Sequence, residues 1–326
     1  MQGRSSRRIV VVGMHRSGTS MVAQMAREWG ASPGDERDLM PPDAVNPQGY
    51  WEHLPLVHLD DELLAATGSS WFCPPASDAA TRALASRPEL RTRALALLAA
   101  MDAQAPVWVW KDPRLSVLLP FWREVWGDVL FVVPVRSPLE SARSIQKRDG
   151  HPVSASLLLW HRSMTSILEN TEGAPRILVR YEALVEDPDA GAQGLAANLD
   201  EAWGRSGTPP EALSAMAAAV RPALRRNRVE EDFERSPLGT AVQKALAAYL
   251  DRLFRSDAGP YASARFPLYP GWREYLETVT ALQEERRRLH ALAVDRDRRL
   301  AEKDAQIAAL SSYPRVETVR RPRASR

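Results

Sequence analysis

The 326-residue sequence predicts an α/β fold of three layers, in which helices cover both faces of a central parallel sheet. Four short runs rich in Val, Leu, Ile and Trp are apolar without strict alternation, as strands buried on both faces are. Helical patterns lie between these runs, and strands that alternate with helices are typical of a parallel sheet. A glycine-containing turn after the first run adds a P-loop-like phosphate-binding loop to this fold class.

The individual elements follow from local sequence signals. The predicted strands are residues 8–14, 107–110, 129–136 and 176–182, and the predicted helices are residues 19–29, 80–101, 138–148 and 153–170. Gly30 follows the first of these helices, and Pro138 begins the third. Proline is favoured at the first helical position and glycine just after the last one, so these residues set the expected ends of two helices.

Residues 31–56 interrupt the alternation and predict a long irregular segment. The stretch ASPGDERDLMPPDAVNPQGYWEHLP is rich in Pro, Gly, Asp and Asn and follows the first strand–helix unit. Ligands of open α/β sheets bind beyond the carboxyl ends of the strands. A long loop in that region is therefore expected to be functional, the alternative being a plain surface excursion.

The last part of the chain predicts a helical extension. Residues 205–255 are helical in pattern, rich in Ala and Leu, and complete the α/β domain. The predicted organisation is a tail (1–7), the α/β domain (8–258), a linker (259–274), an amphipathic or coiled-coil helix (275–311) and a disordered basic tail (312–326). Seven of ten heptad a and d positions between Val279 and Leu310 are apolar. This weak coiled-coil pattern predicts an extension through which two chains can form a homodimer.

Composition excludes several classes of protein. Hydrophobic residues make up 44% and charged residues 26% of the chain, and the net charge of +2 is too small for general nucleic-acid binding. No run of 18 apolar residues occurs, so neither a membrane span nor a signal peptide is expected. A single cysteine, Cys73, allows no disulfide framework and predicts a reducing, cytoplasmic location.

The stretch VVVGMHRSGTS, residues 10–20, is nearly a phosphate-binding loop of the pattern G-x-x-x-x-G-K-[ST]. Gly13 and Gly18 let the backbone approach an anion, and the first N–H groups of the following helix point toward it. Thr19 replaces the lysine that reaches the β and γ phosphates of a nucleoside triphosphate, while Arg16 stands inside the loop. The loop therefore predicts a ligand with fewer phosphates and no metal, although a structural turn would look similar.

A second anion site is predicted at the end of the third strand. Arg136 ends that strand, Ser144 follows eight residues later, and Arg148 shares a helix face with Ser144 by i, i+4 spacing. A strand-end arginine with a serine and an arginine on the next helix can hold a phosphate through charge-assisted hydrogen bonds. Such a spacing also occurs by chance, so its weight depends on the loop at residues 13–20.

Taken together, these motifs resemble the sulfotransferase family, which uses 3′-phosphoadenosine 5′-phosphosulfate (PAPS) as sulfate donor. The segment GMHRSGTS is similar to the family's 5′-phosphosulfate loop, which implies donor contacts from Arg16, Ser17, Gly18, Thr19 and Ser20. The Arg-to-Ser spacing resembles the family's 3′-phosphate motif, and the further arginine matches its tyrosylprotein branch. The resemblance covers about residues 8–190 and implies PAPS as cofactor without a metal.

Two further stretches fit the same resemblance. VWVWKDPR is similar to the Lys-Asp-Pro segment of tyrosylprotein sulfotransferases, in which the lysine assists transfer, and this implies the same role for Lys111. ILVRYEALVEDP resembles a Tyr-Glu-x-Leu segment of the family and implies that Tyr181 reaches the cofactor, the alternative being a core tyrosine. Asp112 and Arg114 are expected to pair with each other.

Sulfuryl transfer needs a base for the acceptor's proton and cations for the charge that develops on the bridging oxygen. Arg16 and Lys111 are the predicted cations. The family uses a glutamate or a histidine as base, and the best match here is Glu52, favoured over its neighbour His53. Lesser candidates for the base are Glu36 and Asp43.

The acceptor is predicted only by class, as a hydroxyl or amine of a carbohydrate or small molecule. Trp51, Trp71 and Trp110 are expected near the site, where they can stack on an acceptor ring or serve as core residues. Two alternatives stay open, a P-loop kinase or nucleotidase and a non-catalytic binding protein on the same fold. The first of them would be favoured by a strand ending in Asp, whereas two of the predicted strands lead into Lys111 and Arg136.

Overall fold

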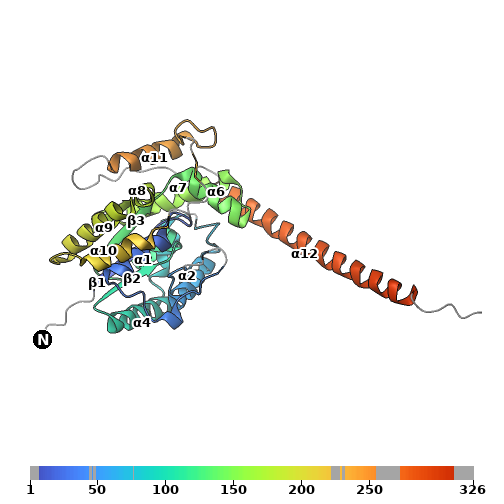
Figure 1. Cartoon of the computed structure of the whole chain (residues 1–326), viewed down its shortest axis with the longest axis horizontal. Coiled ribbons are helices and arrows are strands. Elements are labelled where there is room, and N and C mark those ends of the chain that lie inside the picture. Colours follow the sequence, from blue (N-terminus) through green and yellow to red (C-terminus); the bar gives the residue numbers. More distant parts are fainter. Residues whose placement is uncertain are drawn as a thin grey trace, which may run out of the picture. The chain divides into compact units, whose positions relative to one another are not determined.

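A computed structural model describes residues 7–43, 46, 49–75, 77–221, 228–229, 232–254 and 272–311. The chain divides into two compact units, Met1–Val279 and Thr280–Arg326. In the first unit the described residues form a four-stranded parallel sheet with the order β2-β1-β3-β4. Its strands are β1 (Arg7–Val11), β2 (Val107–Lys111), β3 (Leu130–Val135) and β4 (Arg176–Arg180). Figure 1 labels β1, β2 and β3 among the helices that surround them. The predicted α/β class with a parallel sheet is confirmed.

Each strand lies within or close to its predicted run, and the ends differ for local reasons. Strand β1 stops at Val11, short of the predicted end at residue 14, because the chain enters the turn around Gly13. Strand β4 stops at Arg180 because Tyr181 already begins helix α8 (Tyr181–Glu186). All six residues of β3 are buried, as expected for a strand between two others.

The helices follow the strands in the predicted alternation. They are α1 (Thr19–Trp29), α2 (Leu54–Ala66), α3 (Asp78–Leu84), α4 (Pro88–Gln104), α5 (Leu115–Trp122), α6 (Pro138–Asp149), α7 (Val153–Asn170), α8, α9 (Pro188–Trp203), α10 (Pro210–Ala219), α11 (Ala241–Leu253) and α12 (Trp272–Ser311), with a 3-10 turn at Glu36–Asp38. The bounds of α1 and α7 are as predicted, and α6 ends one residue later than predicted.

Three predictions of secondary structure were wrong in part. The single helix predicted over 80–101 is two helices, because Pro88 lacks a backbone N–H donor and begins α4 instead of continuing α3. The segment 31–56, predicted to be irregular, gives way to α2 at Leu54. The region 205–255 is not continuously helical, because residues 232–240, which directly precede α11, are not helical.

Two apolar clusters, one on each face of the sheet, join the sheet to a layer of helices on either side, which gives three layers. On one face Val10, Trp110 and Phe131 pack with residues of α2, α4, α5 and α7. On the other face Ile9 and Val132 pack with residues of α1, α9 and α10. Side chains of successive strand residues point to opposite faces, so each strand contributes to both clusters. The sheet is thereby fixed between helices, with its carboxyl ends free to carry a site.

The predicted C-terminal helical extension is present as α12. Its first turns belong to the first unit, where Leu276 and Val279 are buried and Tyr275 hydrogen-bonds Ser154 at 2.8 Å between hydroxyl oxygens. In the second unit Leu282, Leu289 and other apolar side chains of α12 are exposed. The predicted tail 312–326 and most of the predicted linker and N-terminal tail lie outside the described residues.

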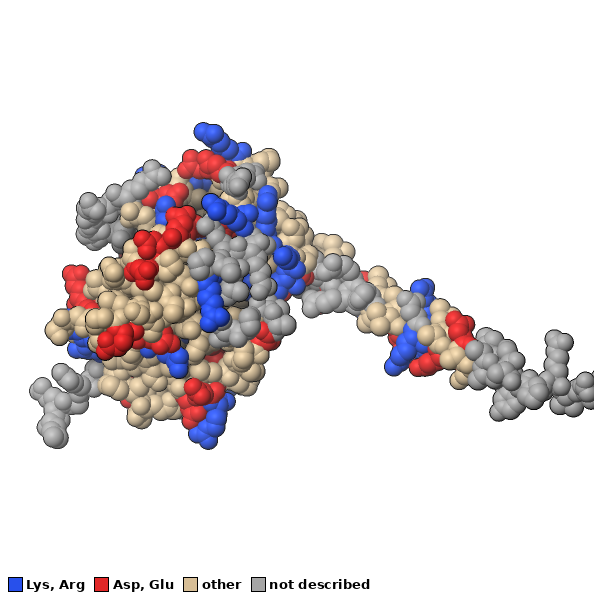
Figure 2. All heavy atoms as spheres, in the orientation of Figure 1, with Lys and Arg blue, Asp and Glu red and all other residues tan. Residues whose placement is uncertain are grey.

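The surface of the described residues carries both basic and acidic side chains. On the face shown in Figure 2, basic and acidic side chains are interspersed over the first unit. Among the helices that the structure describes, none is both long and apolar enough to cross a membrane.

Candidate active site

A cavity of about 640 Å³ lies where β1, β2 and β3 lead into their following turns and helices. Its walls include most of the residues that the sequence singled out: Arg16, Gly18, Thr19, Ser20, Glu52, Lys111, Arg136, Ser144, Arg148 and Tyr181. Residues separated by more than 160 positions thus share one cavity. Its position beyond the carboxyl ends of parallel strands is the usual place for a ligand in an open α/β sheet.

The loop before α1 has a backbone that only a few residue types accept. Arg16 has φ +69° and Gly18 has φ +95°, so both are in the left-handed region. A Cβ atom at Gly18 would lie 2.5 Å from Cδ2 of Tyr181, so a larger residue there would force the Tyr181 ring to move. No side chain caps the amino end of α1, so the first N–H groups of that helix have no side-chain acceptor at its cap. An anion is a natural partner for such groups.

Ser17 serves the loop itself. Its hydroxyl donates a hydrogen bond to the carbonyl oxygen of Met14 at 2.7 Å, and Ser17 is not part of the cavity wall. A Cβ atom at Gly13 would lie 2.7 Å from the Ser17 Oγ, so a larger residue at position 13 would displace the Ser17 hydroxyl. The structure therefore gives Ser17 a supporting position in the loop.

Arg136 joins the second anion site to the loop. Its Nε and Nη2 atoms donate to Glu140 Oε2 at 3.1 and 2.9 Å, and Nη1 donates to the carbonyl oxygen of Arg16 at 3.0 Å. Its guanidinium also lies over the Tyr181 ring, 4.4 Å from the centroid. Sequence reasoning missed Glu140, although its i, i+4 spacing from Arg136 was a signal for a pair.

The two predicted anion sites touch each other. Arg16 Nε donates to Ser144 Oγ at 3.0 Å, across 128 residues of sequence. Arg148 binds Asp149 with its Nε and lies 5.5 Å from the centroid of Trp71. Burial lowers the pKa of Arg16, and the charges of Arg148 and Arg136 lower it further. Cations that repel one another in a cavity favour an anionic ligand.

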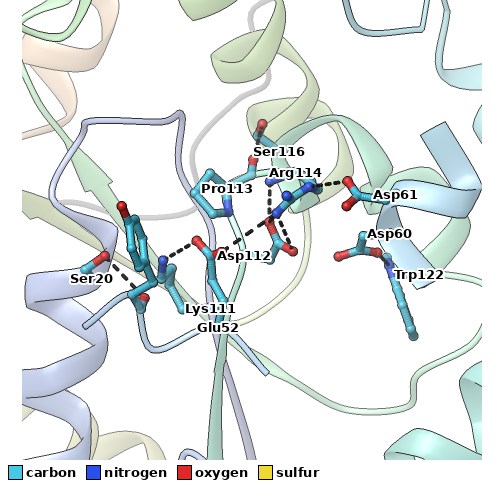
Figure 3. Close-up of polar contacts among 11 residues, drawn as sticks. Ser20, Glu52, Asp60, Asp61, Lys111, Asp112, Pro113, Arg114, Ser116 and Trp122 are labelled. Atoms are coloured by element: carbon cyan, nitrogen blue, oxygen red, sulfur yellow. Dashed lines mark hydrogen bonds and ion pairs between the residues drawn. The ribbon is translucent and has the colours of Figure 1, made fainter. Parts of the chain in front are cut away.

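Lys111 and Glu52 form a buried ion pair in the cavity (Figure 3). The Lys111 Nζ donates to Glu52 Oε1 at 2.6 Å, and the two residues are 1% and 5% exposed. Arg114 Nη1 lies 3.8 Å from the other carboxylate oxygen of Glu52. The expected pairing of Asp112 with Arg114 is present, at 3.0 Å between Oδ1 and Nη1.

The other base candidates lie outside the cavity wall. His53 directly precedes α2 without a capping side-chain hydrogen bond, and its ring lies against Gly34 with Nε2 3.8 Å from Asp38 Oδ2. Burial lowers the pKa of His53 below its usual value. Asp43 accepts a hydrogen bond from the Tyr50 hydroxyl at 2.8 Å, and Glu36 is exposed in the 3-10 turn.

The tryptophans separate into two kinds. Trp51 and Trp71 line the cavity, whereas Trp110 is buried in the core with its ring 4.6 Å from that of Trp122. Of the two alternatives for Trp110, the structure shows the core position, because alternate residues of β2 face opposite sides of the sheet. His15, which sequence reasoning missed, lines the cavity and packs on Trp71 at 4.6 Å between ring centroids. Burial and the charges of Arg148, Arg114 and Lys111 lower its pKa well below the usual value.

A family model described as "Sulfotransferase family" matches residues 8–205. Among solved structures, a sulfotransferase domain from an olefin synthase of Synechococcus is 16% identical, with 79% of this chain and 98% of that chain covered and a TM-score of 0.46. A sulfotransferase from Mycobacterium tuberculosis is also 16% identical, with 65% and 71% covered and a TM-score of 0.41. No curated protein sequence matches the chain.

Proposed function

The chain belongs to the sulfotransferase family, and from that premise we propose that it transfers the sulfuryl group of PAPS to a hydroxyl or amine of a carbohydrate or small-molecule acceptor. The observation that carries the proposal is the shared cavity. Two anion-binding sets, one around the loop before α1 and one around Arg136, line it together with the Lys111–Glu52 pair. PAPS carries two anionic groups and one transferable group, which matches these three features.

The residues present fit the donor. The uncapped amino end of α1 with Thr19 and Ser20 suits a 5′-phosphosulfate, because backbone N–H groups and hydroxyls bind anions there. Arg136, Ser144 and Arg148 suit a 3′-phosphate through charge-assisted hydrogen bonds. Thr19 in place of the triphosphate lysine agrees with a ligand that has no γ phosphate.

In the proposed reaction the acceptor oxygen or nitrogen attacks sulfur in line with the bond to the bridging oxygen. Glu52 takes the acceptor's proton, the new bond to sulfur forms, and the electrons of the broken bond remain on the bridging oxygen of 3′-phosphoadenosine 5′-phosphate. Lys111 and Arg16 supply positive charge for that oxygen. Because Lys111 is bonded to Glu52 at 2.6 Å in this structure, a turn of its ammonium group toward the bridging oxygen would release Glu52 Oε1 as proton acceptor.

We also propose a cytoplasmic location. The chain has one cysteine, the buried Cys73, and so cannot form the intrachain disulfides typical of oxidising compartments.

The test is a screen for transfer of radiolabelled sulfate from PAPS to a panel of neutral carbohydrates, phenols and amines. We expect label in at least one acceptor class, in buffer that contains EDTA, with turnover lost in the Lys111→Ala variant. Transfer of phosphate from ATP under the same screen with Mg²⁺ added, and none from PAPS, would instead favour a kinase.

A further inference from the structure

Two fully buried carboxyl groups that interact with Arg114 take no part in the proposed transfer. Asp60 comes from α2 and Asp112 from the turn after β2, and each is 0% exposed. The two groups interact, and the negative charge of Asp112 raises the pKa of Asp60. Because a carboxylate has only acceptor oxygens, a hydrogen bond between the two side chains requires a proton on one of them. Two buried, unprotonated carboxylates in contact would also repel each other strongly.

The surroundings decide which of the two carries the proton. Asp112 accepts hydrogen bonds from the Arg114 backbone N at 2.9 Å and from Arg114 Nη1 at 3.0 and 3.2 Å. Asp60 Oδ1 accepts only from the neutral indole of Trp122 at 2.8 Å, and its Oδ2 is buried without a donor among the described residues. A carboxylate beside a guanidinium keeps its charge, so the proton belongs on Asp60 Oδ2.

Charge and burial agree with this assignment. Burial raises the pKa of Asp60 well above its usual value, and the negative charge of Asp112 raises it further. The charged groups that face Asp60 are Asp112 and Arg114. Burial also raises the pKa of Asp112, but the charge of Arg114 opposes that shift. With Asp60 neutral, the buried carboxylates Glu52 and Asp112 balance the cations Lys111 and Arg114.

Arg114 connects the buried pair to the proposed base. Its Nη1 contacts Asp112 and lies 3.8 Å from Glu52 Oε2, while its Nε donates to the exposed Asp61 at 2.7 Å (Figure 3). We propose that Asp60 is a positioning residue, a neutral acid that donates to Asp112, which in turn holds Arg114 against Glu52. The effect on turnover rests on the proposed function, whereas the proton on Asp60 is a property of the folded chain alone.

The proton is tested by unfolding, without donor or acceptor. Asn at position 60 keeps the shape of a neutral Asp and still donates to Asp112. In the wild type Asp60 is protonated when folded and ionised when unfolded, so its folded pKa is raised and stability falls as pH rises. The unfolding constant of the wild type divided by that of Asp60→Asn should therefore rise by up to about tenfold per pH unit between pH 5 and 8. Chemical denaturation at each pH measures it.

Glu62→Gln is the matched control for that experiment. Glu62 lies on the same helix, at the surface, in an ion pair with Arg93. The unfolding constant of the wild type divided by that of Glu62→Gln should change by no more than about twofold across this pH range. A flat or falling ratio for Asp60→Asn would overturn the assignment of the proton.

The positioning role is tested by turnover with PAPS and an acceptor found by the screen. Asp60→Leu removes the donor to Asp112 and should lower kcat about tenfold to a hundredfold, with the affinity for 3′-phosphoadenosine 5′-phosphate unchanged. Asp60→Asn restores the donor and should recover most of that loss. An Asp60→Asn variant as slow as Asp60→Leu would overturn the role. A wild type without turnover would overturn it together with the proposed function, while the unfolding data still decide where the proton lies.

Discussion

Glu52 has two carboxylate oxygens in different surroundings. Oε1 accepts the short hydrogen bond from Lys111, and Oε2 lies 3.8 Å from Arg114 Nη1. Both neighbours are cations, so each carboxylate oxygen of Glu52 faces positive charge. The chemistry at residue scale therefore depends on how these two contacts change when donor and acceptor bind.

Glu52→Gln should keep the binding of 3′-phosphoadenosine 5′-phosphate within about twofold of wild type. It should lower kcat by about 10²- to 10⁴-fold, because the amide cannot take the acceptor's proton. Calorimetry and a sulfate-transfer assay measure the two quantities. His53→Gln is the companion variant, since His53 lies outside the cavity wall and should leave kcat unchanged. A kcat that falls in His53→Gln but not in Glu52→Gln would mean that Glu52 is not the base.

Ser144→Ala should weaken the binding of 3′-phosphoadenosine 5′-phosphate by about tenfold to a hundredfold, the scale of one hydrogen bond to a charged group. Ser144 lines the cavity and contacts Arg16. Ser141→Ala is the control, because Ser141 is buried on the same helix and does not line the cavity. Equal affinities of the two variants would remove Ser144 from the phosphate site.

Arg136 has a structural role that would confuse an Arg136→Ala test of phosphate binding. The guanidinium binds Glu140, which is 1% exposed, and also the loop carbonyl of Arg16. Removing it leaves a buried carboxylate without that cation, and broken pairs of this kind cost about 3–5 kcal/mol of stability. A lower affinity of that variant would therefore combine two effects, the lost contact with the phosphate and the destabilised fold.

Among the elements, the turn from β1 into α1 does most to shape the site. Its sequence signals were readable, because glycines that directly follow a predicted strand mark such a turn. Helices α1, α6 and α7 were predictable as well, with Gly30 and Pro138 at two of their ends. Helix α5 was not, since all eight of its residues are buried and no polar face reveals a helical period.

Gly18→Ala should destabilise the protein by more than about 1 kcal/mol and weaken donor binding. The added methyl group meets Tyr181 at 2.5 Å, and the φ of +95° is strained for alanine. Gly194→Ala in helix α9 is the control: a Cβ there meets no atom within 4 Å, so stability should rise slightly. Thermal unfolding compares the two, and a Gly18→Ala variant as stable as wild type would contradict this account of the loop.

At the scale of the whole molecule, the site depends on which strands are neighbours. Strand β1 lies between β2 and β3, so the turns after all three strands meet at one cavity. Local spacing in the sequence linked Arg136, Ser144 and Arg148, and family resemblance singled out Glu52; all four line this cavity, and their roles stay proposals. The sequence could not predict the Arg16–Ser144 contact, the Glu140 partner or the Asp60–Asp112 pair, because these depend on how distant segments pack.

The homodimer through residues 275–311 stays a prediction. The exposed Leu282 and Leu289 of α12 lie at heptad core positions, so glutamate at both should prevent pairing. Sedimentation equilibrium should give twice the chain mass of 36.3 kDa for the wild type and the single mass for Leu282→Glu/Leu289→Glu. A wild type that stays at the single mass at all concentrations would contradict the dimer.

The most direct test of the central claim compares the binding of 3′-phosphoadenosine 5′-phosphate, AMP and ATP to the wild-type chain by calorimetry, with EDTA and then with Mg²⁺. The two-anion cavity predicts tight binding of 3′-phosphoadenosine 5′-phosphate that is independent of Mg²⁺. Loss of the 3′-phosphate in AMP should weaken binding by at least about 100-fold, because contacts of Arg136, Ser144 and Arg148 are lost together. ATP that binds more tightly than 3′-phosphoadenosine 5′-phosphate, and only with Mg²⁺, would contradict the claim.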